Sequence, residues 1–172
     1  MPGRGDYIIY HGDLSVAENS LIAESLIKNV FSRIPFGCII AGKNPPRAIV
    51  NKAFESKNIR IIPNPDTGEM NDLIRNAHIN LLPSLTNNGF KMKLLIALFT
   101  GRHCLVNGIS AENFPDKSVF QIADTNEQLI DKINFLMTQE FTMEMIATRK
   151  KVIEKDFSNE RNARKLAEVI FG

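Results

Sequence analysis

Short apolar runs alternate with longer amphipathic stretches along this chain of 172 residues. Uninterrupted apolar runs are typical of strands buried on both faces, and they predict strands over residues 7–11, 38–41, 59–62, 79–82, 104–106 and 119–123. Apolar residues near a 3.6-residue period predict helices over residues 15–31, 47–56, 69–76 and 90–100, then a helical region from Glu127 to the end with a break near residues 157–158. Strands that alternate with helices predict an α/β domain in which a parallel sheet lies between two layers of helices.

Composition and charge fit one globular domain over residues 1–172. Hydrophobic residues make up 44% of the chain and charged residues 23%. A chain of this size and composition can form a hydrophobic core without disulfide or metal cross-links. The net charge is only +2, whereas a nucleic-acid-binding protein carries a clustered excess of basic residues. We therefore expect no nucleic-acid partner. The longest apolar run, residues 94–99, is far shorter than the roughly 20 residues of a membrane span. Cys38 and Cys104 form neither a metal-binding pattern nor a disulfide framework, which favours a reducing compartment.

Ligands of such sheets bind at the carboxyl ends of the strands, so the loops at that edge are the candidate sites. The first loop contains Gly12 and Asp13, where a glycine lets a ligand approach the backbone and the next helix N-terminus favours an anion. A structural interpretation competes with this one, because Ser15 and Glu18 have the spacing of a capping box. Later loops at the same edge add the candidates Gly42, Lys43 and Asn64.

The loop before the apolar helix at residues 90–100 carries the most informative pattern. Asn88 and Gly89 predict a tight turn at the helix start, and Phe90 follows them. Lys91 and Lys93 then lie in the first turn, where a cation opposes the helix dipole. An anionic ligand that uses the free N–H groups and the lysines would explain this placement, and exposed lysines that tolerate a small cost are the alternative. The glycine patterns of P-loops and of the common dinucleotide-binding folds are absent, and no catalytic residue can be assigned.

Residues 79–106 resemble the donor-binding segment of glycosyltransferases that have two facing Rossmann-like domains. The matching letters are Leu82, Pro83, Ser84, Gly89, Phe90, Leu94, Leu95, Ala97, Leu98, Gly101, Leu105 and Val106. Residues 10–14 resemble the start of that family's C-terminal domain, and residues 40–42 resemble its second strand. Residues 88–96 are similar to a bacterial polysaccharide-type branch of the family. The resemblance covers essentially the whole chain and implies a three-layer α/β/α Rossmann-like domain with a roughly six-stranded parallel sheet and a helical C-terminal tail.

The resemblance implies that the candidates above bind a nucleotide-sugar donor linked to UDP, GDP or ADP. The sequence departs from the family at its two motif glutamates, which contact the sugar and the ribose and are replaced here by Asn88 and Ile96. The family's diphosphate-binding arginine is replaced by Asp13, and Glu18 falls near the position of its lysine. We hypothesise that Lys91 and Lys93 supply the missing positive charge. Because there is no Asp-x-Asp motif, we expect neither a metal nor another cofactor.

The resemblance also implies that the chain is the C-terminal half of a larger cytoplasmic enzyme. We expect an absent N-terminal acceptor domain, peripheral association of the full-length protein with the inner face of the membrane, and no activity in the isolated half. Residues 158–171 resemble the family's tail, whose apolar face would be exposed here and would favour a homodimer of the fragment. A degenerate, non-catalytic module that acts as an assembly or regulatory partner is the alternative function. A flavodoxin-like or response-regulator-like domain is a weaker one, since the chain lacks a flavin loop or acidic cluster at its strand ends.

Overall fold

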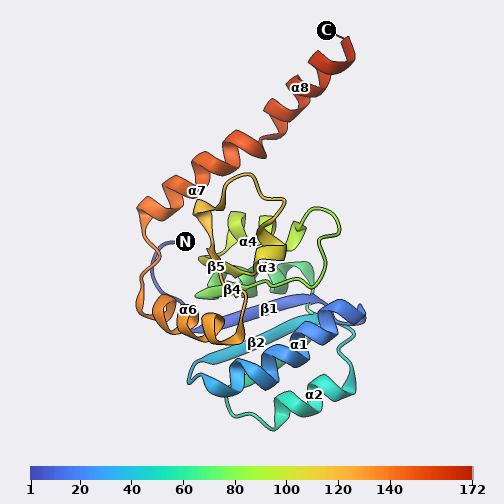
Figure 1. Ribbon diagram of the computed structural model, residues 1–172, viewed down its shortest axis with the longest axis vertical. Coiled ribbons are helices and arrows are strands. Elements are labelled where there is room, and N and C mark those ends of the chain that lie inside the picture. Colours follow the sequence, from blue (N-terminus) through green and yellow to red (C-terminus); the bar gives the residue numbers. More distant parts are fainter. Residues whose placement is uncertain (172) are drawn as a thin grey trace.

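One parallel sheet organises residues 1–171, the part of the chain that this computed structural model describes (Figure 1). Within these residues the sheet has six strands: β1 (Tyr7–Asp13), β2 (Gly37–Lys43), β3 (Ile59–Pro63), β4 (Ile79–Leu81), β5 (His103–Val106) and β6 (Gln121–Ile122). Their order is β3-β2-β1-β4-β5-β6, and all pairings are parallel. The order reverses direction at β1, between β2 and β4, which is where ligands bind in sheets of this topology.

Helices cover both faces of the sheet, as the sequence predicted. One face packs against α1 (Ala17–Asn29), α2 (Arg47–Phe54) and α6 (Asn126–Thr138). The other packs against α3 (Thr67–Asn76), α4 (Met92–Thr100) and α7 (Met143–Asp156), with the single turn α5 (Gly108–Ala111) beside them. Short 3₁₀ segments, η1 (Phe31–Arg33) and η2 (Lys117–Val119), follow α1 and precede β6. The three-layer α/β/α arrangement is therefore confirmed.

The core explains why the strands read as continuous apolar runs. Ile8 and Tyr10 of β1 are fully buried against the α1 side, while Ile9 is fully buried in the cluster on the α3 side. Because successive side chains of a strand point to opposite faces, both faces of a central strand must be apolar when helices cover both. This burial holds the carboxyl end of β1 in the middle of the sheet edge.

The C-terminal helix α8 (Asn159–Phe171) projects away from the three layers (Figure 1). None of its residues is buried, and Leu166, Ile170 and Phe171 are at least 60% exposed. The predicted exposed apolar face of the tail is thus confirmed. Within residues 1–171, no helix has both the length and the apolar character that crossing a membrane requires.

Several predicted boundaries are wrong. The sixth strand is limited to Gln121–Ile122, because residues 117–119 form η2 instead. The long C-terminal helical region has an additional break at residues 139–142, where Gln139 is extended and Thr142 caps α7. The helix predicted at residue 90 begins at Met92, because Gly89 has a φ of 69° and Lys91 occupies the N-cap.

Candidate functional site

A cavity of about 360 Å³ lies at the carboxyl ends of β1 and β2, between α3 and α4. It brings together five of the residues that the sequence suggested, namely Gly12, Asp13, Gly42, Lys43 and Lys93. The remaining lining residues are His11, Pro65, Asp66, Thr67, Met70, Asn71, Ile74 and Ile96. The cavity therefore combines glycine backbone and two lysines with an apolar wall from α3 and α4.

Gly42 is required by the close approach of the β1 and β2 ends, whereas Gly12 faces the side chains of Asn19 and Lys93. A Cβ at Gly42 would collide with the carbonyl oxygen of Gly12, so no side chain fits there. A Cβ at Gly12 would lie 3.3 Å from Lys93 Nζ. The lysine ammonium group thus sits directly over glycine backbone, with no side chain between it and the strand end.

Lys93 is held in this position by polar and aromatic contacts. Its Nζ donates to Asn19 Oδ1 at 2.9 Å and lies 5.4 Å from the centroid of the Tyr10 ring. Among residues 1–171, no ion pair within 4.0 Å links Lys93 to a carboxylate. Burial lowers the pKa of Lys93, while the nearby Glu18 charge acts to raise it. A cation without a carboxylate partner is suited to bind an anionic ligand.

His11 and Asp13 flank Gly12 but have different environments. His11 is buried, and its Nε2 has no hydrogen-bond partner among the described residues. Burial, followed by the Lys93 charge, lowers the pKa of His11 to about 3, so the ring is neutral near pH 7. Asp13 is exposed and accepts hydrogen bonds from Ser15 Oγ at 2.6 Å and from Ser15 N at 3.0 Å, which lower its pKa. The Asp13 carboxylate is therefore engaged in its own turn.

The predicted capping box of Ser15 and Glu18 does not form. The N-cap of α1 is Val16, which has no capping side-chain hydrogen bond, and Ser15 instead bonds to Asp13. Glu18 turns away from its own helix end and accepts hydrogen bonds from Ser84, Leu85 and Thr86. A long-range loop contact has replaced the local cap that the spacing suggested.

Five suggested residues do not line the cavity: Asn64, Asn88, Gly89, Phe90 and Lys91. Asn64 has a φ of 51°, and its Oδ1 accepts a hydrogen bond from Asn44 N at 2.8 Å, which joins the loops after β2 and β3. Lys91 Nζ donates to Thr86 O at 2.7 Å, so Lys91 ties its own loop. Phe90 packs against Phe114 and Phe157, with ring centroids 5.8 and 5.5 Å apart. Of the two lysines in the hypothesis, the structure therefore places Lys93 alone at the cavity.

Two parts of the cavity were not predicted from the sequence, namely the wall formed by α3 and the Asn19 side chain that holds Lys93. Asp66 caps α3 by accepting from Glu69 N at 2.8 Å, and this Asp-x-x-Glu pattern could have located the helix start. Asn19 carries no comparable local signal, because its contact with Lys93 spans 74 residues. Ile96, noted in the sequence as a departure from the family motif, lines the cavity with an apolar side chain.

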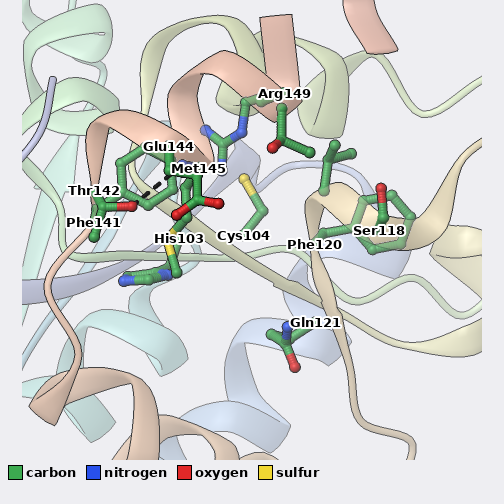
Figure 2. Close-up of a pocket in the computed structure, with 12 residues that line it drawn as sticks. His103, Cys104, Ser118, Phe120, Gln121, Phe141, Thr142, Glu144, Met145 and Arg149 are labelled. Atoms are coloured by element: carbon green, nitrogen blue, oxygen red, sulfur yellow. Dashed lines mark hydrogen bonds between the residues drawn. The ribbon is translucent and has the colours of Figure 1, made fainter. Parts of the chain in front are cut away.

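A second cavity, of about 410 Å³, is lined by His103 and Cys104 at the start of β5 and by side chains of α7 (Figure 2). Arg149 from α7 enters this region and donates to the carbonyl oxygens of Leu98, Gly101 and Arg102 at 2.6–3.3 Å. Burial lowers the pKa of His103 to about 4. Arg149 thus joins α7 to the end of α4, which is a structural role. In the described part of the chain, no group of three His, Cys, Asp or Glu side chains could hold a metal ion.

Comparison with protein families identifies the family of this chain. A family model described as glycosyl transferases group 1 matches residues 5–139. The chain belongs to this family. A comparison with curated proteins gave no match.

Solved structures show the same fold at low sequence identity. The C-terminal domain of a glycosyl transferase group 1 family protein (LpcC) from Francisella tularensis has a TM-score of 0.65 and 16% identity, and the match covers 92% of this chain and 89% of that one. TarM from S. aureus has a TM-score of 0.72 and 14% identity, with coverage of 98% and 36%. A glycosyltransferase from Rickettsia africae has a TM-score of 0.72 and 16% identity, with coverage of 96% and 47%. This chain spans about a third of the TarM chain and has the fold of a group 1 C-terminal domain.

Proposed function

We propose that the cavity at the ends of β1 and β2 binds a nucleotide-sugar donor through its diphosphate. The proposal rests on the placement of Lys93. Its ammonium group is partly buried and lies over the Gly12 backbone, and no carboxylate of the described chain forms an ion pair with it. Lys43 adds a second cation at the same cavity. The glycine backbone gives phosphate oxygens room to approach, and the apolar wall of Met70, Ile74 and Ile96 suits the face of a nucleobase.

The structure of TarM was determined in complex with UDP, which makes UDP the first ligand to test. We propose further that the whole protein transfers a hexose to a glycan or lipid-linked acceptor, as in the polysaccharide-type branch that residues 88–96 resemble. The chemistry would rest on electrostatic stabilisation of the leaving diphosphate by Lys93. The acceptor and the proton-transferring groups would be supplied by the other domain, which places the catalytic site between the two.

Calorimetric titration of this chain with UDP, GDP and ADP tests donor binding. We expect one nucleotide to bind and Lys93→Met to weaken that binding by about tenfold or more, the scale of one charge-assisted contact. Lys57→Met is the matched control, because Lys57 is exposed just before β3, at the amino end of that strand, and lies outside the cavity lining. Equal losses from the two variants, or no binding of any nucleotide by the wild type, would contradict the proposal.

A non-catalytic module is the second candidate, and one observation favours it. Ile96 presents an apolar side chain to the cavity, so α4 offers no carboxylate to the hydroxyl groups of a ribose at that position. In that case none of UDP, GDP and ADP would bind to this chain. The titrations described above therefore distinguish the two functions.

A further inference from the structure

Glu18 lies in the first turn of α1 and reaches across to the loop that joins β4 to α4. Its Oε1 accepts hydrogen bonds from Ser84 Oγ at 2.7 Å, from Leu85 N at 2.8 Å and from Thr86 N at 3.2 Å. Its Oε2 accepts from Thr86 Oγ1 at 3.0 Å. One carboxylate thus binds three consecutive residues of a loop that is 66–68 positions away in the sequence.

The same turn of α1 also holds the lysine of the proposed donor site. Asn19, the residue after Glu18, accepts from Lys93 Nζ through Oδ1 at 2.9 Å and donates from Nδ2 to Asp13 O at 2.8 Å. Lys93 lies in the first turn of α4, directly after the loop that Glu18 binds. Two adjacent residues of α1 therefore fix the loop before α4, the first turn of α4 and the end of β1 relative to one another.

We propose that Glu18 is a positioning residue for the donor site, which holds the β4–α4 loop against α1 and thereby keeps Lys93 over the Gly12 backbone. This inference rests on the proposed donor binding. A site whose groups are ordered before the ligand arrives binds more tightly, because binding then loses less conformational entropy. Loss of the Glu18 contacts should therefore weaken binding, although the Glu18 side chain is itself negatively charged and lies outside the cavity lining.

Two substitutions of Glu18 separate the effect of its hydrogen bonds from the effect of its negative charge. Three of the bonds end on Oε1, which glutamine retains as a carbonyl acceptor. The glutamine amide can donate to Thr86 Oγ1, which takes the place of the fourth bond. Glu18→Gln thus preserves the contacts and removes a negative charge, whereas Glu18→Ala removes both.

The test is a titration of wild type and variants with the nucleoside diphosphate that the wild type binds, at a temperature at which each variant is folded. We expect Glu18→Ala to weaken binding by about tenfold or more and Glu18→Gln to change it by less than about threefold. Glu24→Ala is the matched control, since Glu24 lies on the same helix and pairs with Lys52 at 3.0 Å instead of with the loop. It should leave the affinity unchanged.

Hydrogen exchange supplies the second measurement. The amides of Leu85 and Thr86 donate to Glu18, so they should exchange faster in Glu18→Ala and remain protected in Glu18→Gln and Glu24→Ala. Thr86→Val removes one bond at nearly constant volume and should weaken nucleotide binding by about threefold, which tests the proposal if Glu18→Ala does not fold.

Two outcomes overturn the inference in distinguishable ways. If the wild type binds a nucleotide and Glu18→Ala and Thr86→Val bind it equally well, with only a lower melting temperature, Glu18 is a structural residue and donor binding stands. If the wild type binds none of UDP, GDP and ADP, the proposed function fails and the positioning role fails with it.

Discussion

At the scale of single residues, Glu18 shows how a long-range contact changes titration. The Ser84 hydroxyl, and then the Leu85 and Thr86 groups, stabilise its ionised form and lower its pKa from 4.5 to about 2, against the opposing effect of burial. A carboxyl with a lower pKa in the folded state binds fewer protons there than in the unfolded state. Its contribution to stability is therefore complete above its unfolded pKa of 4.5 and is lost as the pH falls towards about 2.

This linkage predicts a pH-dependent difference between wild type and Glu18→Gln. The difference in the free energy of unfolding should be constant at neutral pH and should shrink as the pH falls from about 4.5 to about 2, because glutamine does not titrate. Chemical unfolding followed by circular dichroism at a series of pH values measures it. A difference that stays constant down to the lowest pH would show that the loop contacts do not perturb Glu18.

The sequence identified the residues that touch the cavity better than it identified their partners. Gly12, Gly42 and Lys93 were expected at a binding site and line the cavity, because strand-end glycines and a lysine in a first helical turn are local signals. Glu18 was expected to cap its own helix, and its actual partners lie 66–68 residues away. Local spacing cannot reveal which of two competing contacts is better, since the second depends on how the β4–α4 loop folds.

At the scale of elements, periodicity located the strands and helices, and capping decided their ends. The predicted alternation of strands and helices is correct, but α6 and α7 were predicted as one helix. The break has a physical cause, because Thr142 accepts a hydrogen bond from Met145 N and starts a new helix. The turn α5 was missed since four residues give no measurable period.

One threonine and one serine test the difference between a helix N-cap that the structure shows and one that only the sequence spacing suggested. Thr125 forms a reciprocal capping box with Gln128 at the start of α6, whereas Ser15 bonds only within the turn before α1. We expect Thr125→Ala to lower the free energy of unfolding by about 1 kcal/mol and Ser15→Ala to lower it by less than about 0.5 kcal/mol. Urea unfolding of both variants checks this, and equal effects would contradict the assignment of the caps.

At the scale of the whole molecule, the cavity is assembled from elements that are far apart in the sequence. The ends of β1 and β2 provide the backbone, α3 the wall and α4 the lysine, and the sheet order places them together at the reversal point beside β1. The solved structures with TM-scores of 0.65–0.72 and the α/β pattern of the sequence agree on this fold. The wall residues could not be predicted, because the packing of α3 beside α4 follows from side chains in three layers and not from any one motif.

The projecting helix α8 exposes an apolar face through which whole molecules can associate. Its apolar residues Leu166, Ile170 and Phe171 are 60–86% exposed and recur at helical spacing, so they form a face that water solvates poorly. We expect the isolated chain to self-associate as its concentration rises, and sedimentation equilibrium measures this. A Leu166→Glu, Ile170→Glu variant should be monomeric, because charges on that face would have to be desolvated in the associated state. Arg161→Glu, on the polar side of the same helix, should associate like the wild type, and a monomeric wild type at high concentration would contradict the prediction.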